Sequence, residues 1–364
     1  MADIQVRNLN KMFGDFTAVE DSTFTVEDGE FFVMLGPSGC GKTTTLRMIA
    51  GLELPTSGSI HIGGKNVTFA RARDRDIAFV FQLFALYPHM NVRKNMAFPL
   101  VSMGMSRAEI KQRVEETARL LQIDHILERS VSGLAGGDRQ RVALGRAIVR
   151  RPDCFLMDEP LGTLDTEFRD VMTEELLNLH DRIDATTVYV THDQLEAMSM
   201  ADKIAVMNHG IIEQFGTPRE IYDRPATLFV ADFIGSPSMN VLPVTGAVEA
   251  GADAVTVAGA SVPVPRQHEG ATAAMLGVRP EAIALDDASA LRGTIASSEY
   301  MGTNQIVSID IGDHSVRAKI SSALPVREGE TVGLALAPER ITLFDKETGR
   351  ALRSDLHENV REAA

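Results

Sequence analysis

The stretch Gly36-Pro-Ser-Gly-Cys-Gly-Lys-Thr43 decides the fold of this chain of 364 residues. It fits the pattern G-x-x-x-x-G-K-[ST] of a phosphate-binding loop. The apolar run 31–35 before it predicts a buried parallel strand, and residues 44–50 after it predict a helix. Glycines let backbone N–H groups turn inward around phosphate oxygens, and a helix N-terminus adds a favourable dipole. The stretch therefore predicts a nucleotide site rather than a glycine-rich turn without a ligand.

The side chains of this loop have separate expected roles. Lys42 would reach the β- and γ-phosphates, and the Thr43 hydroxyl would ligate Mg²⁺. The residues expected to surround the nucleotide are Gly36, Pro37, Ser38, Gly39, Cys40, Gly41, Lys42, Thr43 and Thr44. A reactive role for the Cys40 thiol is the weaker interpretation, because a small residue in a tight loop explains the cysteine as well.

Length and charge narrow the class of protein. A chain of this length should hold at least two domains, and its net charge is −14. The parts before and after Val241 are both acidic, which argues against a nucleic-acid or anionic-lipid surface. Cys40 and Cys154 do not suggest a disulfide, as is typical of a reducing compartment. No signal peptide and no apolar run of membrane-spanning length are expected, so any membrane part should belong to another chain.

Strands alternating with helices over residues 1–235 predict an α/β domain with a largely parallel core sheet. The strands are expected at 4–13, 22–26, 31–35, 77–81, 154–157 and 187–191. Helices are expected after the capping box Ser106-Arg-Ala-Glu109, over 138–150, and after Thr217-Pro-Arg-Glu220.

Composition shifts at Gly235-Ser-Pro-Ser238, and the chain beyond it is rich in short alternating strands such as 305–311. The pattern Pro-Glu-x-Ile-x-Leu occurs twice there, starting at positions 280 and 338, which are 58 residues apart. This repeat predicts a doubled small β-unit.

Four polar residues lie at the expected carboxyl ends of strands, where a parallel sheet gathers them beside the phosphate loop. Asp158 could hold the Mg²⁺ shell, and Glu159 could polarise the attacking water as general base. His192 could meet the γ-phosphate, and the Gln82 amide could touch both the water and Mg²⁺. A single strand-end histidine is more often structural, but four such strand-end residues converging on one loop favour a catalytic site.

In their order along the chain, these motifs resemble an ATP-binding-cassette ATPase. The segments that carry the resemblance are Gly36–Thr43, Gln82, Leu134-Ala-Gly-Gly-Asp-Arg-Gln-Arg141, Leu156-Met-Asp-Glu-Pro160, Leu164-Asp165 and Thr191-His-Asp193. The similarity is closer still to ATPase subunits of the bacterial carbohydrate- and polyol-uptake importers, a group that includes those for maltose and glycerol phosphate. Segments 85–90, 146–149 and 233–237 carry this closer similarity, which covers essentially the whole chain.

The resemblance implies a P-loop cassette over residues 1–235, with a helical subdomain at about 88–152, and an oligonucleotide/oligosaccharide-binding-like (OB-like) β-barrel over 236–364. It implies that two ATPase subunits face each other and that each signature loop completes the other's ATP site. The residues that it adds to the ATP site are Phe13, under the adenine, and Ala135, Gly136, Gly137, Asp138 and Asp165. It also implies two transmembrane permease subunits, docked near Gln82, an external solute-binding protein, and a place on the cytoplasmic face of a bacterial inner membrane.

The signature departs from the family's Leu-Ser-Gly-Gly-Gln. Ala135 lacks the hydroxyl that bonds the γ-phosphate across the dimer, and Asp138 adds a negative charge near ATP. Arg139 and Arg141 are close enough in sequence to offset this charge, and Gly162 stands where a serine is usual. A partner ATPase of different sequence would confine the altered signature to one site, so the sequence favours a heterodimer, with a homodimer as the alternative.

Two other classes of function remain open at this point. One is a soluble cassette ATPase that acts on ribosomes or DNA, but such proteins typically carry two cassettes, basic arms or coiled coils. The other is a regulatory partner in an ATPase heterodimer, with the β-rich part as its binding module. The energising subunit of a solute importer is the leading hypothesis, and the solute itself cannot be read from this chain.

Overall fold

The apolar strand β3 (Phe31–Leu35) lies inside a six-stranded sheet, with every residue buried, as its sequence predicts. In spatial order the other strands are β10 (Ile211–Gly216) and β9 (Lys203–Asn208) on one side, and β8 (Thr186–Thr191), β7 (Cys154–Asp158) and β6 (Ile77–Val80) on the other. All neighbours are parallel except β9 and β10. The carboxyl ends of β3, β6, β7 and β8 therefore meet at one edge.

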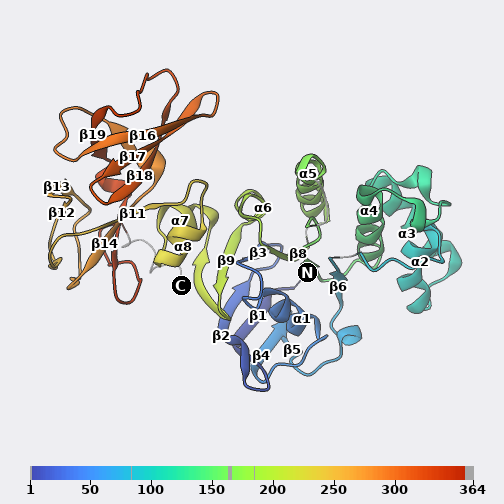
Figure 1. Ribbon diagram of the computed structural model, residues 1–364. Coiled ribbons are helices and arrows are strands. Elements are labelled where there is room, and N and C mark those ends of the chain that lie inside the picture. Colours follow the sequence, from blue (N-terminus) through green and yellow to red (C-terminus); the bar gives the residue numbers. More distant parts are fainter. Residues whose placement is uncertain (1, 83, 163–165, 184, 357–364) are drawn as a thin grey trace. The chain divides into compact units, whose positions relative to one another are not determined.

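The computed structural model describes residues 2–82, 84–162, 166–183 and 185–356, and the chain divides into the units 1–218 and 219–364. In the first unit a four-stranded antiparallel sheet accompanies the six-stranded one. Its strands are β2 (Phe16–Val26), β1 (Ile4–Phe13), β4 (Ser57–Ile62) and β5 (Lys65–Asn66). Helix α1 (Lys42–Ala50) contacts β7 and β8 as well as β2, so one apolar core joins the two sheets around this helix (Figure 1).

Three helices fall within the range 88–152 that the sequence predicts for a helical subdomain, namely α2 (Val92–Ser102), α3 (Arg107–Leu120) and α4 (Gly136–Ile148). They contact one another, and Figure 1 shows them together at one end of the six-stranded sheet, beyond β6. The predicted capping box that opens α3 is confirmed, because the Ser106 hydroxyl accepts from the Glu109 N–H and the Glu109 carboxylate accepts from the Ser106 N–H. Helices α5 (Thr166–Ile183) and α6 (Gln194–Met200) contact each other.

Several element bounds differ from the sequence predictions, each for a local reason. Strand β2 begins at Phe16 rather than residue 22, because a tight hairpin pairs Phe16 with Phe13 and continues the ladder. Strand β6 ends at Val80, so Gln82 follows it by two residues. Helix α4 starts at Gly136, with Ala135 as its N-cap, and ends at Ile148, because Arg151 adopts a left-handed φ of 53° just before a proline.

A buried arginine fixes the far end of the phosphate-loop helix α1. Arg75 is only 3% exposed, and its guanidinium donates to four backbone carbonyls. Nη1 reaches the oxygens of Met48 (2.8 Å) and Ile49 (2.7 Å), Nη2 reaches Thr68 (3.1 Å) and Ala70 (2.9 Å), and Nε also reaches Ala70 (3.1 Å). The positive charge lies at the negative end of the helix dipole and satisfies carbonyls that the helix leaves unpaired.

Gly51, the C-cap of α1, is required by this arrangement. Its φ of 69° is left-handed, and an added Cβ would lie 2.5 Å from the Arg75 Nε. Only glycine combines that conformation with the space that the guanidinium occupies.

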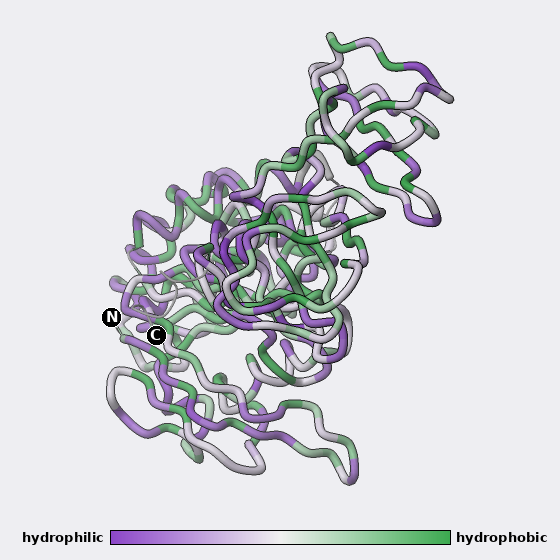
Figure 2. Tube along the Cα trace, turned by 90° about the vertical axis from the view of Figure 1, so that its left-hand side faces the viewer, coloured by the Kyte–Doolittle hydropathy of each residue, from purple (hydrophilic) through white to green (hydrophobic). Residues whose placement is uncertain are grey.

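The second unit is built of strands around its own apolar core. It holds a three-stranded sheet of β11 (Asn240–Pro243), β14 (Ala274–Val278) and β20 (Ile341–Asp345), and a two-stranded sheet of β12 (Ala254–Val257) and β13 (Ala260–Pro263). The third sheet has the order β15 (Ile283–Leu285), β19 (Thr331–Leu336), β16 (Arg292–Tyr300), β17 (Asn304–Ile311) and β18 (His314–Ser321). Burial alternates along β17 and β18, and hydropathy changes from residue to residue along such extended segments in Figure 2.

The two copies of Pro-Glu-x-Ile-x-Leu adopt the same local structure. Each copy begins with a 3₁₀ turn, Pro280–Ala282 or Pro338–Arg340, which leads directly into β15 or β20. The strands that flank the turns exchange partners, since β14 pairs with β20 and β15 pairs with β19. The predicted β-rich domain is thus confirmed, with both copies at equivalent places in it.

The compact units divide after Pro218, whereas the sequence predicts a domain boundary after Gly235. The intervening helices α7 (Pro218–Asp223) and α8 (Leu228–Phe233) are tied to the β-rich unit by the buried Arg279. Its guanidinium donates to the carbonyls of Tyr222, Ala231 and Ile234, and its carbon lies 4.3 Å from the centre of the Tyr222 ring. A loop-like composition change at 235–238 does not reveal such contacts, so the boundary after Gly235 stays a prediction.

Among the helices of the described residues, none has the length and apolar character to cross a membrane.

Replacing Arg75 by methionine should lower the free energy of unfolding by about 3 kcal/mol or more, because each buried carbonyl that loses its donor costs about 1–3 kcal/mol. The matched control is Arg73→Met, since the Arg73 side chain is 75% exposed in an ion pair with Asp74. The control should change stability by less than about 0.5 kcal/mol. Chemical denaturation of both variants measures the difference, and equal stabilities would contradict the structural role of Arg75.

Candidate nucleotide-binding site

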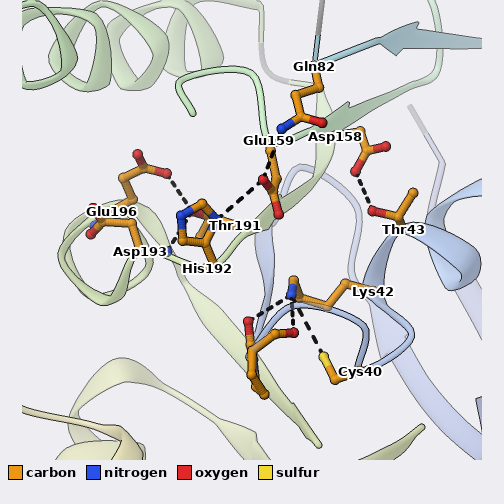
Figure 3. Close-up of polar contacts among 12 residues, drawn as sticks. Cys40, Lys42, Thr43, Gln82, Asp158, Glu159, Thr191, His192, Asp193 and Glu196 are labelled. Carbon is orange, nitrogen blue, oxygen red and sulfur yellow. Dashed lines mark hydrogen bonds and ion pairs between the residues drawn. The ribbon is translucent and has the colours of Figure 1, made fainter. Parts of the chain in front are cut away.

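The phosphate loop connects β3 to α1 through two glycines with left-handed backbone, Gly39 (φ 81°) and Gly41 (φ 105°). Lys42 is buried, and its Nζ donates to the carbonyls of Gly36 (2.7 Å) and Pro37 (2.9 Å), so the ammonium lies inside the loop (Figure 3). The loop thus surrounds a fixed positive charge at a helix N-terminus, which is the arrangement that favours phosphate.

Space as well as conformation restricts this loop. A Cβ added to Gly36 would lie 2.2 Å from the backbone oxygen of Met207 and 2.8 Å from the Cys40 Sγ.

Cys40 and Cys154 are both buried and free, which confirms the prediction that they form no disulfide. Burial raises the pKa of the Cys40 thiol, although nearby Lys42 opposes the shift, so the uncharged form is favoured. The thiol therefore fills space, as the more conservative interpretation of the sequence expects.

Thr43 and Asp158 form the first pair of the site across two elements. The Thr43 hydroxyl, on the first turn of α1, donates to the Asp158 Oδ1 at the end of β7 at 2.8 Å. Burial raises the pKa of Asp158, while the hydrogen bond from Thr43 and the charges of Arg47 and Lys42 oppose this shift. A carboxylate oxygen and a hydroxyl oxygen are thus adjacent, and both are ligands that Mg²⁺ prefers.

Glu159 is the centre of the second group. Its backbone adopts φ 44°, and its N–H donates to the Val190 carbonyl on β8 at 3.0 Å. The carboxylate Oε2 accepts from the Gln82 Nε2 at 3.3 Å and lies 3.3 Å from the His192 Nδ1 (Figure 3). The structure thus brings together the three predicted catalytic side chains, with a carboxylate held between an amide and an imidazole.

Within the described residues, no group of three or more His, Cys, Asp or Glu side chains could hold a metal ion. Mg²⁺ in nucleotide sites takes only one or two protein ligands and completes its shell with phosphate oxygens and water. Thr43 and Asp158 fit that demand, and Figure 3 shows the Gln82 side chain on the same side of Glu159 as Asp158.

The signature segment is not joined to this group. Ala135 caps α4 without a side-chain hydrogen bond, and Asp138 lies in the first turn, 3.7 Å from the Arg141 Nη1. Arg141 also donates to both carboxylate oxygens of Glu175, at 3.0 and 2.8 Å. Among the described residues, no hydrogen bond or ion pair links residues 135–138 to the phosphate loop. The charge of Asp138 is therefore offset by Arg141, one of the two arginines that the sequence suggested.

Two further predicted residues stand apart. Phe13, at the end of β1, is a partly exposed ring with the Lys11 ammonium 4.6 Å from its centre, which leaves an aromatic face beside a positive charge. Asp165 lies outside the described residues, as does Thr163.

A polar network that the sequence did not predict lies next to His192. Asp193 caps α6 by accepting from the N–H groups of Leu195 (2.8 Å) and Glu196 (3.2 Å), and Arg169 of α5 pairs with Asp193 at 2.9 Å. The available signal was the spacing Asp193-x-x-Glu196 before an apolar run, which is typical of a helix start. Nothing in the sequence pointed to Arg169, because it lies 24 residues from Asp193.

Comparison with known proteins gives family matches over both units. Residues 19–162 match the model of the ABC transporter family, and residues 276–344 match the TOBE domain. The chain is 45% identical to the trehalose/maltose import ATP-binding protein MalK of Thermococcus litoralis, over 97% of this chain and 100% of the relative. It is 46% identical to the sn-glycerol-3-phosphate import ATP-binding protein UgpC of Salmonella typhi, over 96% of this chain and 99% of the relative.

Among solved structures, the chain is similar to cbiO1 from Clostridium perfringens, part of the ABC transporter complex cbiONQ. The TM-score is 0.57 and the identity 26%, over 60% of this chain and 89% of that one.

Replacing Gly36 by alanine should weaken nucleotide binding by about tenfold or more, because relieving an overpacked contact costs about 1–3 kcal/mol and 1.4 kcal/mol is a tenfold change in affinity. The matched control is Gly133→Ala, where an added Cβ would meet nothing within 4 Å. Titration with a fluorescent nucleotide measures both affinities. Binding by Gly36→Ala that equals binding by the control would show that the contact with Met207 does not shape the loop.

Proposed function

The chain belongs to the ABC transporter family as one of its ATP-binding subunits, and from this we propose that it hydrolyses ATP to energise the import of a small solute through partner membrane subunits. Its relatives are named for trehalose and maltose or for sn-glycerol 3-phosphate. We therefore propose a sugar, a polyol, glycerol or glycerol phosphate as the solute. The chain matches these import subunits over nearly their whole length, so a non-transport cassette ATPase is not favoured.

The observation that carries the enzymatic part is the contact of Glu159 with both Gln82 and His192 beside the phosphate loop. A carboxylate at this place can accept a proton from the attacking water as general base. The Gln82 amide can orient that water, and the His192 imidazole can donate toward the γ-phosphate while it holds Glu159. Lys42 and the loop N–H groups would hold the phosphates of ATP.

We propose Mg²⁺ as the second cofactor, held by Thr43 and Asp158 with Gln82 beside them. When bound, the cation would neutralise part of the negative charge of the phosphates. The chain's own contribution is a hydroxyl and a carboxylate already 2.8 Å apart. The remaining proposed ATP contacts are Phe13, Asp165 and, across a subunit pair, the segment 135–138.

The membrane partner has a candidate docking groove in the first unit. A groove of about 290 Å³ is lined by Phe79, Phe81, Tyr87, Phe98, Pro99 and Arg146, among others. Arg146 donates to the carbonyls of Phe84 (2.8 Å) and Ala85 (2.7 Å), two residues with left-handed φ that closely follow Gln82. An apolar helix end of each permease subunit would fit this groove, and the segment held by Arg146 connects it to the catalytic Gln82.

The second ATPase of the complex is proposed to differ from this chain. Ala135 offers no hydroxyl, and a mixed pair would confine this defect to one site. The offset of the Asp138 charge by Arg141 favours the homodimer instead, so the proposal depends on the missing hydroxyl. A homodimer is the alternative, and the masses of the ATPase subunits in the assembled transporter decide between the two. Two copies of this chain would contradict the mixed pair.

We further propose an external solute-binding protein and a peripheral position on the cytoplasmic face of a bacterial inner membrane.

Glu159→Gln should keep ATP binding and lower the rate of hydrolysis by about 10²–10⁴-fold, because the phosphate contacts remain while the water loses its base. Single-turnover hydrolysis and nucleotide titration separate the two effects. The matched control is Glu328→Gln on an exposed loop of the β-rich unit, which should hydrolyse ATP at the parent rate. Turnover by Glu159→Gln close to that of the control would exclude Glu159 as the base.

Phe98→Glu should prevent stable assembly with the membrane subunits, because an unpaired buried carboxylate costs several kcal/mol. Phe98 is partly exposed at the groove, and its ring lies 4.7 Å from that of Tyr87. The control is Phe69→Glu, a substitution of a strongly exposed ring that does not line this groove. Co-purification with the permease subunits measures assembly. Loss of assembly in both variants, or in neither, would contradict the groove as the docking site.

A further inference from the structure

A polar network joins α5 to the segment that carries His192. Arg169, on the first turns of α5, pairs through Nη1 with the Asp193 Oδ2 at 2.9 Å and through Nε with the Glu196 Oε1 at 3.6 Å. Asp193 and Glu196 belong to the start of α6, so a single guanidinium links the beginnings of two helices (Figure 3 shows the two carboxylates).

Glu196 is a buried carboxylate with several polar partners. It is 5% exposed, and its Oε2 accepts from the hydroxyls of Tyr189 (2.8 Å) and Thr191 (2.7 Å) on β8. Burial raises the pKa of Glu196, and the two hydroxyls and Arg169 oppose the shift. A buried carboxylate is stable only when it is hydrogen-bonded and paired, so Arg169 supports the whole group.

This network fixes both neighbours of His192 in the chain. On one side, the Thr191 hydroxyl bonds Glu196 and also accepts from the Asp193 N–H at 3.0 Å. On the other, Asp193 is held by Arg169 and by its own cap of α6. The His192 side chain itself is 53% exposed and lies 3.3 Å from the Glu159 carboxylate. Its position therefore depends on the backbone on either side rather than on packing around the ring.

We propose that Arg169 is a positioning residue for hydrolysis, which holds His192 against Glu159 through Asp193 and Glu196. This inference rests on the proposed ATPase function, because it says how His192 is aligned for that reaction. Arg169 contributes no group to the reacting atoms in this scheme. The competing view is that the network only stabilises the contact between α5 and α6, in which case its loss would lower stability but would not act through His192.

A double-mutant cycle in the full-length chain distinguishes the two views. Arg169→Met, which keeps much of the side-chain volume, should lower kcat by about 10²-fold, because misplacing a reacting group by about 1 Å has that effect. The KM for ATP should change little, because Lys42, Thr43 and Asp158 are untouched. In a His192→Ala background the same substitution should cause no further loss, since a residue that acts through His192 has nothing left to align. Independent losses that multiply would overturn the proposal.

Two further variants keep the test decisive if Arg169→Met folds poorly. Asp193→Asn retains a helix-capping oxygen but removes the charge that Arg169 pairs with, so it should lower kcat in the same way while α6 stays capped. Arg169→Lys should recover part of the lost kcat, because it restores the positive charge. Arg182→Met, on the exposed end of the same helix, is the control and should match the parent chain in kcat.

The parent chain separates failure of this inference from failure of the proposed function. A parent chain that hydrolyses no ATP, alone or with its membrane partners, would contradict the function itself. A parent chain that hydrolyses ATP while Arg169→Met and Asp193→Asn do so equally well would overturn only the positioning role.

Discussion

The parallel register of β3, β8 and β7 is the constraint on which the site depends. Leu35 at the end of β3 lies opposite Thr191, and Asp158 at the end of β7 lies opposite Val190. Because the strands run parallel and end together, the phosphate loop, Glu159 and His192 emerge at one edge of the sheet. A shift of one residue in any of these pairs would turn every side chain to the other face, so the buried apolar strands specify the geometry of the polar site.

Much of this arrangement is predictable from the sequence, because short apolar runs followed by polar residues reveal both the strands and their functional ends. The phosphate loop, the Thr43–Asp158 pair and the convergence of Gln82, Glu159 and His192 all follow from that pattern. Arg75 and Arg169 do not, because each satisfies groups on elements remote in sequence, and a lone arginine between polar residues carries no periodic signal. The division of the chain after Pro218 is likewise not predictable, because Arg279 binds backbone carbonyls, which every residue has.

Buried arginines serve the two units in the same physical way. Arg75 saturates the carbonyl end of α1, and Arg279 saturates carbonyls of α7 and α8, each with a planar fork of donors that no other side chain provides. Arg146 does the same for Phe84 and Ala85 beside the groove. In each case backbone carbonyls outside the sheets keep hydrogen-bond donors, and for Phe84 and Ala85 this fixes a loop close to Gln82.

The exchange of partners between the repeated halves of the β-rich unit has a consequence for the order in which the chain acquires structure. Strand β14 needs β20, and β15 needs β19, so the first half presents unpaired edges until residues 331–345 have been synthesised. Such non-local pairing is slow to form and leaves exposed edges that invite wrong partners. A ribosome that delivers the chain from its N-terminus releases all strands of the first unit long before this closure. Strand β20 therefore completes the folding of the β-rich unit. A chain shortened before Ile341 would lack the strand that completes the three-stranded sheet.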